Sequence, residues 1–384
     1  YEAAEKMITV YNYRPDVNKQ VKNRSNGYGD AADYNKDDTI TYKVVVDVPA
    51  NIVKLKKFVL ADTPTHLKDD SASVKVYSDE DMKTVVEPEN IYSVKGTGEG
   101  FTITFTPDQM GTFAGKKLYV SYTATLKKDE NGNFTGSTTV DGNSNSIVLT
   151  YSNKTKLTQE EAENPNNQTK IKDEAVVYSF QLNVQKTNGT QNLGAGVMFD
   201  LYKQVGNTTT GEDVIAGTEV EKYGFDKNYN YIKVVSGLTT DDDGKVSYKG
   251  LANGTYWLLE TKTVDGYNLL AKPVKVELSI AYKTSWSEEK EYKDGVLVKH
   301  ELTKKDEKFE PDKNNDAMNG GTQSGYTVGD DKIGGQEATI INKKGFQLPV
   351  SGVFGTLLFS GRGVLLVLAG VAVLFSMKKK NDRA

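Results

Sequence analysis

The chain has 384 residues, a formal net charge of -4 at pH 7 and no cysteine. Nucleic-acid binding needs a basic surface, which this net charge argues against, and the lack of cysteine excludes disulfides and thiol chemistry. The length is sufficient for two or three domains. The sequence begins at Tyr1 with no methionine and no basic-then-apolar leader, so we expect any secretion signal to precede Tyr1.

The first part of the chain, residues 1–154, is expected to form a β-sandwich domain. Its clearest strand lies within residues 39–49, where alternation puts apolar side chains on one face. They are Ile40, Tyr42, Val44, Val46 and Val48. Residues 101–107 and 117–126 alternate in the same way, and turn-forming clusters at 131–133 and 141–143 separate the strands. Because no long stretch of helical period competes with these strands, a sandwich is predicted.

The remainder of the chain predicts a linker and a second β-sandwich. Residues 155–173 are polar, with TQEEAENPNNQTK at their centre, and have little to bury, so they are expected to be a linker. Residues 174–343 are again rich in strands, with hairpin-type turns at 243–244 and 253–254. Within them, residues 290–335 are charged and then glycine-rich, which predicts a long surface excursion. The predicted fold class is therefore all-β, with two sandwiches in tandem.

The end of the chain combines a pentapeptide, an apolar run and a basic tail. Residues 344–352 are a spacer that ends in Leu348, Pro349, Val350, Ser351 and Gly352. Residues 353–377 are almost all apolar or small, which is close to the ~20 residues that a membrane helix needs. The lysines and arginine of residues 378–384 would hold the end on the cytoplasmic side, so the bulk of the chain is expected outside the cell. Taken alone, the apolar run also fits a simple tail anchor.

Three polar side chains of the second sandwich share strand faces with apolar residues. Lys186 continues the apolar face of residues 178–184. Glu260 has the same parity as Tyr256 and Leu258, and Asn342 has the same parity as Ala338 and Ile340. A lysine on an apolar face is costly unless it is neutral or bonded. The alternative for each residue is ordinary: a lysine that extends to solvent, a surface glutamate and a turn asparagine.

The first sandwich repeats this arrangement in the same order. Lys19 shares a face with Val17 and Val21, and Asp62 follows the apolar residues of 58–60. Asn153 continues the apolar face of residues 147–151. In both parts the lysine comes near the first strand, the acid in the middle and the asparagine on the last strand.

A buried lysine, carboxyl group and asparagine can form a covalent cross-link. Desolvation lowers the pKa of the lysine, which makes it a neutral nucleophile, and raises the pKa of the carboxyl group, which can then move protons. The amine attacks the carboxamide, ammonia leaves and an amide remains. The reaction needs no cofactor and happens once per molecule. By the chain-entropy treatment of disulfides, each cross-link would add at most ~5 kcal/mol of stability.

Two long segments resemble Gram-positive pilins. VQKTNGTQNLGAGVMFDLYK, TTDDDGKVSYKGLANGTYWLLETKTVDGY and the closing ATIINKKG are similar to the Cna B-type domain, including its E-box motif at residues 256–267. PDVNKQVKN, FTITFTPDQMG and GNSNSIVLTYSN resemble the isopeptide-forming domain that precedes it in backbone pilins. The resemblance implies immunoglobulin-like (Cna-type) sandwiches. It also implies two bond-forming sets: Lys19 to Asn153 with Asp62, and Lys186 to Asn342 with Glu260.

The tail resembles the cell-wall sorting signal of the same surface proteins. In that family sortase, a membrane transpeptidase, cuts the pentapeptide before its glycine, here between Ser351 and Gly352, and joins the new end to an amine. Ser351 stands where threonine is usual. The resemblance implies sortase, peptidoglycan or other pilin subunits as partners, and a cell-wall-anchored protein that is bound to the membrane only before cleavage.

One segment departs from the pilin pattern. Residues 10–14, Val-Tyr-Asn-Tyr-Arg, occupy the place of the pilin motif but hold no lysine at the polymerising position. The position within a fibre is therefore left open. The alternative to a pilin subunit is a monomeric wall-anchored adhesin whose domains form a stalk or bind host extracellular matrix.

Other chemistry finds little support in the sequence. His66 and His300 are the only histidines, and neither has the spacing of a hydrolase triad or a metal site. The acidic run at 241–243 lacks the alternation of a calcium loop. We therefore expect neither a metal nor an enzyme with turnover.

Overall fold

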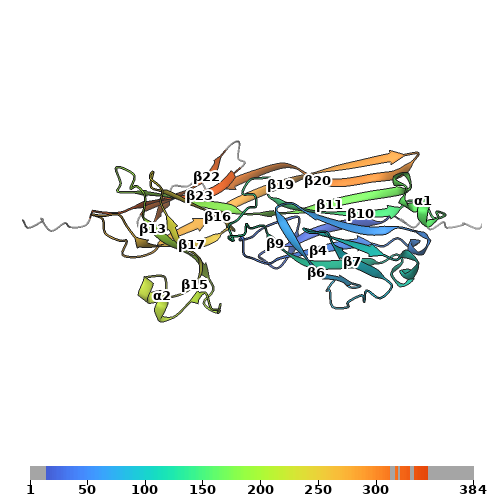
Figure 1. Cartoon of the computed structure of the whole chain (residues 1–384), viewed down its shortest axis with the longest axis horizontal. Coiled ribbons are helices and arrows are strands. Elements are labelled where there is room, and N and C mark those ends of the chain that lie inside the picture. Colours follow the sequence, from blue (N-terminus) through green and yellow to red (C-terminus); the bar gives the residue numbers. More distant parts are fainter. Residues whose placement is uncertain (1–13, 312–315, 319–320, 329–332, 345–384) are drawn as a thin grey trace, which may run out of the picture.

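The computed structural model describes residues 14–311, 316–318, 321–328 and 333–344. Within them, four β-sheets pack as two sandwiches that follow one another along an elongated molecule (Figure 1). The predicted all-β class is confirmed, because strands dominate the described part of the chain.

The first sandwich is built from two sheets that enclose one apolar core. One sheet has the strand order β2 (Tyr28–Gly29), β1 (Asp16–Lys22), β4 (Ile40–Asp47), β9 (Lys117–Leu126) and β6 (Leu67–Tyr77). The other has the order β19 (Ile280–Lys293), β20 (Val296–Pro311), β11 (Gln168–Tyr178), β10 (Asn143–Ser152), β5 (Phe58–Pro64), β8 (Phe101–Phe105) and β7 (Tyr92–Gly96), and β3 (Ala31–Asp33) also pairs with β11. Every second residue of β4 is buried, as the alternation of its sequence predicted.

The second sandwich encloses a separate core. One of its sheets has the order β16 (Lys245–Leu251), β12 (Phe180–Thr187), β23 (Ile333–Ile341), β22 (Gly321–Val328) and β21 (Asp316–Met318). The other has the order β14 (Val214–Ile215), β15 (Asn230–Thr239), β13 (Met198–Val205), β17 (Gly254–Lys262) and β18 (Val274–Leu278). Buried apolar residues of both sheets form its core, and Tyr178 of β11, Ile280 of β19 and Phe309 of β20 join it from the first sandwich.

Two turns of the second sandwich differ from the expectation. Residues 240–244, which include the predicted turn at 243–244, join β15 to β16, and residues 252–253 join β16 to β17. In both cases the two strands belong to different sheets. These segments turn tightly, as Asp-Gly and Asn-Gly pairs favour, but they are not hairpins. The sequence thus predicted the positions of the turns correctly. It did not predict that each turn would cross from one sheet to the facing sheet.

Helices are short and lie at the edges. They are α1 (Gln159–Glu163), α2 (Thr218–Tyr223), and the 3-10 turns η1 (Ile52–Lys54), η2 (Pro107–Gln109), η3 (Gly111–Phe113) and η4 (Pro165–Asn167). Helix α1 begins at a capping box, in which the Thr158 side chain accepts from the Glu161 amide and Glu161 accepts from the Thr158 amide.

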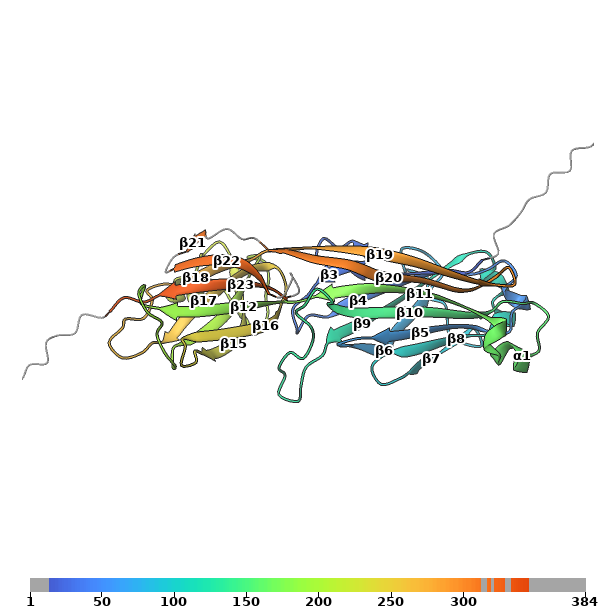
Figure 2. The ribbon, with the colours of Figure 1, turned by 90° about the horizontal axis from the view of Figure 1, so that it is seen from above.

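A ribbon of two strands from the later part of the chain completes a sheet of the first sandwich. Strands β19 and β20 run along β11 and β10, far beyond the second sandwich (Figure 2). Strand β20 pairs in parallel with β11, with Ile171 opposite His300. The expected surface excursion at 290–335 is therefore wrong for the strand residues that the structure describes. Residues 290–293 and 296–311 pair in the ribbon, and residues 316–318, 321–328 and 333–335 lie in β21, β22 and β23 of the second sandwich. Residues 168–173 of the expected linker likewise lie in β11.

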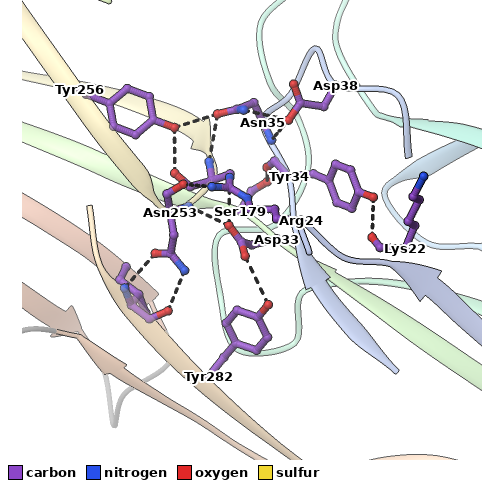
Figure 3. Close-up of polar contacts among 12 residues, drawn as sticks. Lys22, Arg24, Asp33, Tyr34, Asn35, Asp38, Ser179, Asn253, Tyr256 and Tyr282 are labelled. Carbon is purple, nitrogen blue, oxygen red and sulfur yellow. Dashed lines mark hydrogen bonds and ion pairs between the residues drawn. The ribbon is translucent and has the colours of Figure 1, made fainter. Parts of the chain in front are cut away.

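Polar contacts hold the two sandwiches together where β11 passes into β12 (Figure 3). Asp33, at the end of β3, accepts a hydrogen bond from the Asn253 amide at 2.8 Å and one from the Tyr282 hydroxyl at 3.3 Å. The Tyr256 hydroxyl donates to Asn35 Oδ1 at 2.8 Å. Asp33 and Asn35 belong to the first sandwich, whereas Asn253 and Tyr256 belong to the second, so the bonds to Asn253 and Tyr256 fix one sandwich against the other. Tyr282 lies on β19 and ties the ribbon to the same junction.

The same junction includes an ion pair and a close backbone approach. Arg24 lies 3.1 Å from Asp33 and also donates to the Asn253 carbonyl. Gly250 has φ 83°, and a Cβ there would lie 2.8 Å from the Lys36 Cβ. Glycine therefore permits the approach that lets the Lys36 amide donate to the Gly250 carbonyl.

Among the described residues, no helix is long and apolar enough to cross a membrane. The expected membrane segment 353–377, the basic tail 378–384 and the pentapeptide 348–352 all lie outside the described residues.

Candidate functional site

The second sandwich brings together the lysine, acid and asparagine that the sequence singled out. Lys186 lies on β12, and Asn342 directly follows β23, the parallel neighbour of β12. Glu260 comes from β17 in the facing sheet. All three are buried, with 0 %, 1 % and 5 % of Lys186, Asn342 and Glu260 exposed. The alternation of the sequence predicted that these three side chains point into the sandwich, and all three do.

The contacts in this site join each group to the other two. Lys186 Nζ lies 2.6 Å from Asn342 Oδ1 and 3.6 Å from Glu260 Oε1. Asn342 Nδ2 donates to the Glu260 carboxyl oxygens at 2.9 and 3.1 Å. One carboxyl group thus touches both the amine and the amide nitrogen.

Neighbouring groups hold this arrangement in place. Asn342 Nδ2 also donates to Thr263 Oγ1 at 2.8 Å, and the Leu270 amide donates to Glu260 Oε2 at 2.9 Å. Burial lowers the pKa of Lys186 to about 8, against the opposing charge of Glu260. About a tenth of this lysine is therefore the neutral, nucleophilic amine at pH 7, far more than for a lysine with an ordinary pKa.

A second buried lysine lies in the core of the first sandwich. Lys19 on β1 forms an ion pair of 2.5 Å with Asp62 on β5, and both side chains are inaccessible to solvent. The Lys19 ammonium lies 5.0 Å from the ring centre of Tyr42 and 5.4 Å from that of Tyr122. Burial lowers the pKa of Lys19, although the charges of Asp62 and Asp69 oppose the shift.

The asparagine that meets this cluster is Asn145 on β10. Its Nδ2 donates to the Tyr122 hydroxyl oxygen at 3.2 Å, and the Tyr122 hydroxyl donates to Asp62 Oδ2 at 2.8 Å. Asp62 is opposite Ile147 in the pairing of β5 with β10, so Asn145 lies two residues from the level of the ion pair. Asn145 is fully buried.

Asn153, the asparagine expected from the sequence, lies elsewhere. It follows the end of β10, six residues beyond Ile147, which is roughly 20 Å at the rise of an antiparallel strand. There it lines a surface hollow of about 300 Å³ with Arg14, Tyr151 and Leu297. The structure does not bring Asn153 to Lys19. Asn145 and Asn153 have the same parity on one strand, so alternation alone could not choose between them.

The structure adds a second acid that the sequence reading missed. Asp69 on β6 is 6 % exposed, and its Oδ1 accepts a hydrogen bond from Asn145 Nδ2 at 3.0 Å. Burial, with a hydrogen bond to Asp62 and the charge of Asp62, raises the pKa of Asp69 to about 9. A signal for it was available, because Asp69 has the parity of the buried Leu67 at the start of β6. Two adjacent aspartates are also typical of a solvent-exposed strand, however, so the parity of Asp69 alone does not identify it as buried.

A third acid supports the backbone of the lysine strand. Asp173 on β11 accepts a hydrogen bond from the Lys19 amide at 2.6 Å. Burial raises the pKa of Asp173 to about 6, and the backbone hydrogen bonds oppose the shift. This contact joins β1 to β11, and hence to the other sheet, beside the buried lysine.

Both clusters hold what an amide-forming reaction needs: an amine, a carboxamide and a carboxyl group shielded from water. In the part of the chain that the structure describes, no group of His, Asp and Glu side chains is arranged to hold a metal ion.

Comparisons with known proteins agree with this architecture. The family described as "SpaA: Prealbumin-like fold domain" matches residues 180–291. No curated protein sequence matches the chain. The T6 backbone pilin of serotype M6 Streptococcus pyogenes is similar in structure, with a TM-score of 0.51 and 16% identity over 86% of this chain and 70% of that chain. This similarity shows a shared pilin-like fold.

Two further solved structures are similar at lower scores. The pilus 2b backbone protein of group B streptococcus has a TM-score of 0.49 and 21% identity over 83% of this chain and 97% of that chain. The pilus backbone RrgB of Streptococcus pneumoniae has a TM-score of 0.45 and 14% identity over 69% of this chain and 93% of that chain.

Proposed function

We propose that the chain is a structural subunit of a Gram-positive pilus in which each sandwich is cross-linked by a self-formed lysine–asparagine amide. The observation that carries the proposal is the second site, where Lys186 Nζ lies 2.6 Å from Asn342 Oδ1 and Glu260 binds the amide nitrogen. The pilin-like fold and the order of pentapeptide, apolar run and basic tail support it.

The contacts of the second site suggest how its bond forms. Glu260 takes a proton from the Lys186 ammonium, and the neutral amine attacks Cγ of Asn342. Glu260 then returns a proton to Nδ2, the carbon–nitrogen bond to Nδ2 breaks and ammonia leaves. The second proton that the lysine nitrogen loses goes back to Glu260, so one carboxyl group handles every transfer.

For the first site we propose Lys19 and Asn145 as the bonded pair, in place of Asn153. Asp62 contacts the amine, and the Tyr122 hydroxyl connects Asp62 to the Asn145 amide. The bond would join β1 to β10, which belong to the two facing sheets. Asn153 lies too far along β10 to take this role.

The proposed role also includes processing by sortase between Ser351 and Gly352. The carbonyl of Ser351 would be transferred to an amine, either of another pilin subunit or of peptidoglycan, and the membrane segment and basic tail would be removed. A monomeric wall-anchored adhesin with the same cross-links is the alternative function. Cell-wall extracts separate the two, because only a pilin subunit gives a ladder of covalent polymers.

The cross-links are tested by the intact mass of the full chain and by peptide mapping. We expect a mass lower than that of the sequence by two molecules of ammonia. Mapping should recover one peptide pair joined at Lys186 and Asn342 and one joined at Lys19 and Asn145. A chain at its full sequence mass would contradict the proposal for both sites.

A further inference from the structure

In the first site two different acids contact the lysine and the asparagine, whereas in the second site one acid contacts both. Asp62 Oδ2 lies 2.5 Å from Lys19 Nζ, and Asp69 Oδ1 lies 3.0 Å from Asn145 Nδ2. In the second site Glu260 contacts both Lys186 and Asn342. Asp69 thus touches the nitrogen that must leave, whereas Asp62 touches the nitrogen that must attack.

We propose that Asp69 is a second catalytic acid in bond formation between Lys19 and Asn145. Asp62 takes the ammonium proton of Lys19, and Asp69 protonates the departing amide nitrogen. This inference rests on the proposed cross-link in the first sandwich.

Burial and pairing keep Asp69 in the acidic form that this role needs. Asp62 Oδ1 and Asp69 Oδ2 are buried, and neither receives a hydrogen bond from an amine, amide or hydroxyl group of the described residues. A proton held between the two carboxyl groups satisfies both oxygens. Because the pKa of Asp69 is raised to about 9, its carboxyl group retains a proton at neutral pH. Asp62 contacts the Lys19 ammonium directly, so it is placed to take the ammonium proton.

The proton count closes with two carboxyl groups and no outside reagent. Before reaction Lys19 is an ammonium, Asp62 a carboxylate and Asp69 a carboxylic acid. Asp62 accepts one proton, and the neutral amine adds to Cγ of Asn145, which makes Nδ2 basic. Asp69 gives its proton to Nδ2, the bond from Cγ to Nδ2 breaks, and ammonia leaves. The lysine nitrogen loses a further proton to Asp69, so an amide, one ammonia and two neutral acids remain.

Tyr122 would position the amide during this sequence. Its hydroxyl donates to Asp62 and accepts from Asn145 Nδ2, and burial raises the pKa of Tyr122 well above its ordinary value. The hydroxyl therefore keeps its proton and holds the amide at a fixed place between the two acids.

The test follows formation of both bonds in the full chain, recovered unfolded from inclusion bodies and refolded at pH 7. Samples are digested at intervals, and the joined peptides of the two sites are counted by mass spectrometry. Asp69→Asn keeps the size of the side chain but cannot donate an acidic proton, and Asp70→Asn changes the exposed neighbour on the same strand as a matched control. The bond between Lys186 and Asn342 serves as an internal reference for folding.

We expect Asp69→Asn to slow the bond between Lys19 and Asn145 by about 10²–10⁴-fold, the usual contribution of a positioned acid. The reference bond and the Asp70→Asn chain should react at the parental rate. Formation of the first bond at the parental rate in Asp69→Asn would overturn the role of Asp69 and leave the cross-link itself intact. Absence of the first bond from the parent would overturn the proposed cross-link as well.

A measurement on the parent chain covers the case in which Asp69→Asn fails to fold. The rate of the first bond is followed from pH 7 to pH 10 while that of the second bond is measured in the same samples. We expect the first rate to fall above about pH 9, where Asp69 loses its proton. The second rate should not fall, because no second acid contributes there. Parallel profiles for the two bonds would overturn the proposal.

Discussion

The two buried lysine sites use different geometries for the same set of groups. In the second sandwich Lys186 and Asn342 belong to neighbouring parallel strands, and the longer side chain of Glu260 reaches both from the facing sheet. In the first sandwich Lys19 and Asn145 come from facing sheets. There the shorter Asp62 contacts the amine but not the amide nitrogen, which Asp69 contacts instead. Under the proposed cross-links, the length of the acidic side chain and the strands that carry the reacting pair set whether one acid or two contact the reacting nitrogens.

The largest expected effect comes from loss of Glu260, the acid of the second site. Glu260 is the one carboxyl group among the described residues that contacts both Lys186 and Asn342, so Glu260→Ala should slow that bond by at least about 10²–10⁴-fold. The first bond should form normally. The measurement is the mass of the intact chain, which should retain one ammonia more than the parent.

Glu337→Ala is the matched control for this variant, because Glu337 lies on the exposed face of β23. It should leave both bonds intact. If Glu260→Ala still loses both ammonias, the assignment of one acid to the second site is wrong.

The next effect concerns stability and separates Asn145 from Asn153. Asn342→Ala removes a cross-link between residues 156 positions apart, and the chain-entropy treatment gives at most about 5 kcal/mol for a closed loop of this size. Asn145→Ala should lower the free energy of unfolding by a similar amount. Both are measured by denaturant unfolding of the full chain, with the transition of each sandwich followed separately.

Asn153→Ala is the control for the first sandwich, because it lies at the surface hollow and away from Lys19. We expect it to retain the cross-link and to change stability by less than about 1 kcal/mol. A large loss of stability and of the cross-link in Asn153→Ala, with Asn145→Ala unaffected, would reverse the assignment.

The smallest expected effect is the pH dependence of the second bond. The pKa of Lys186 is lowered to about 8, and only the neutral amine attacks, so the neutral fraction falls about tenfold for each pH unit well below that value. The rate should therefore rise between pH 6 and pH 8 and level off above it. Refolding at a series of pH values, with the joined peptide counted over time, measures this profile. A rate that does not change between pH 6 and pH 8 would show that loss of the lysine proton does not limit the reaction.

Alternation along strands predicted most of the candidate sites. It placed Lys19, Asp62, Lys186, Glu260 and Asn342 on inward faces, and all five are buried. Alternation could not choose between Asn145 and Asn153, because both have the same parity and so would point to the same face of the sheet. The choice depends on the pairing of β5 with β10, which sets Asp62 opposite Ile147 and therefore close to Asn145. Parity has a period of two, whereas the position along a strand depends on partners distant in sequence.

The ribbon of β19 and β20 could not be predicted for a related reason. Its residues are charged along much of their length, as in EEKEYK and TKKDEK, so their sequence resembles a solvated segment. Their pairing with β11 joins residues more than a hundred positions apart, and local sequence carries no signal of such a contact. The sequence therefore predicts which side chains of a strand face inward, but not which strand lies beside it.

The ribbon has a consequence for the order in which the molecule is completed during synthesis. Apart from the ribbon of β19 and β20, strands β1 to β11 complete the first sandwich. Strand β3 pairs with residues 176–178 on the outer edge of β11, but residues 170–172 on that edge have their partner in β20. A chain that emerges from its N-terminus leaves this edge uncovered until residue 311 has appeared, by which time most of the second sandwich has also emerged. An uncovered edge can pair with another chain, so the interval before β20 arrives is when two nascent copies are most exposed to mispairing. Completion of the first sandwich is thus tied to the translation of the second.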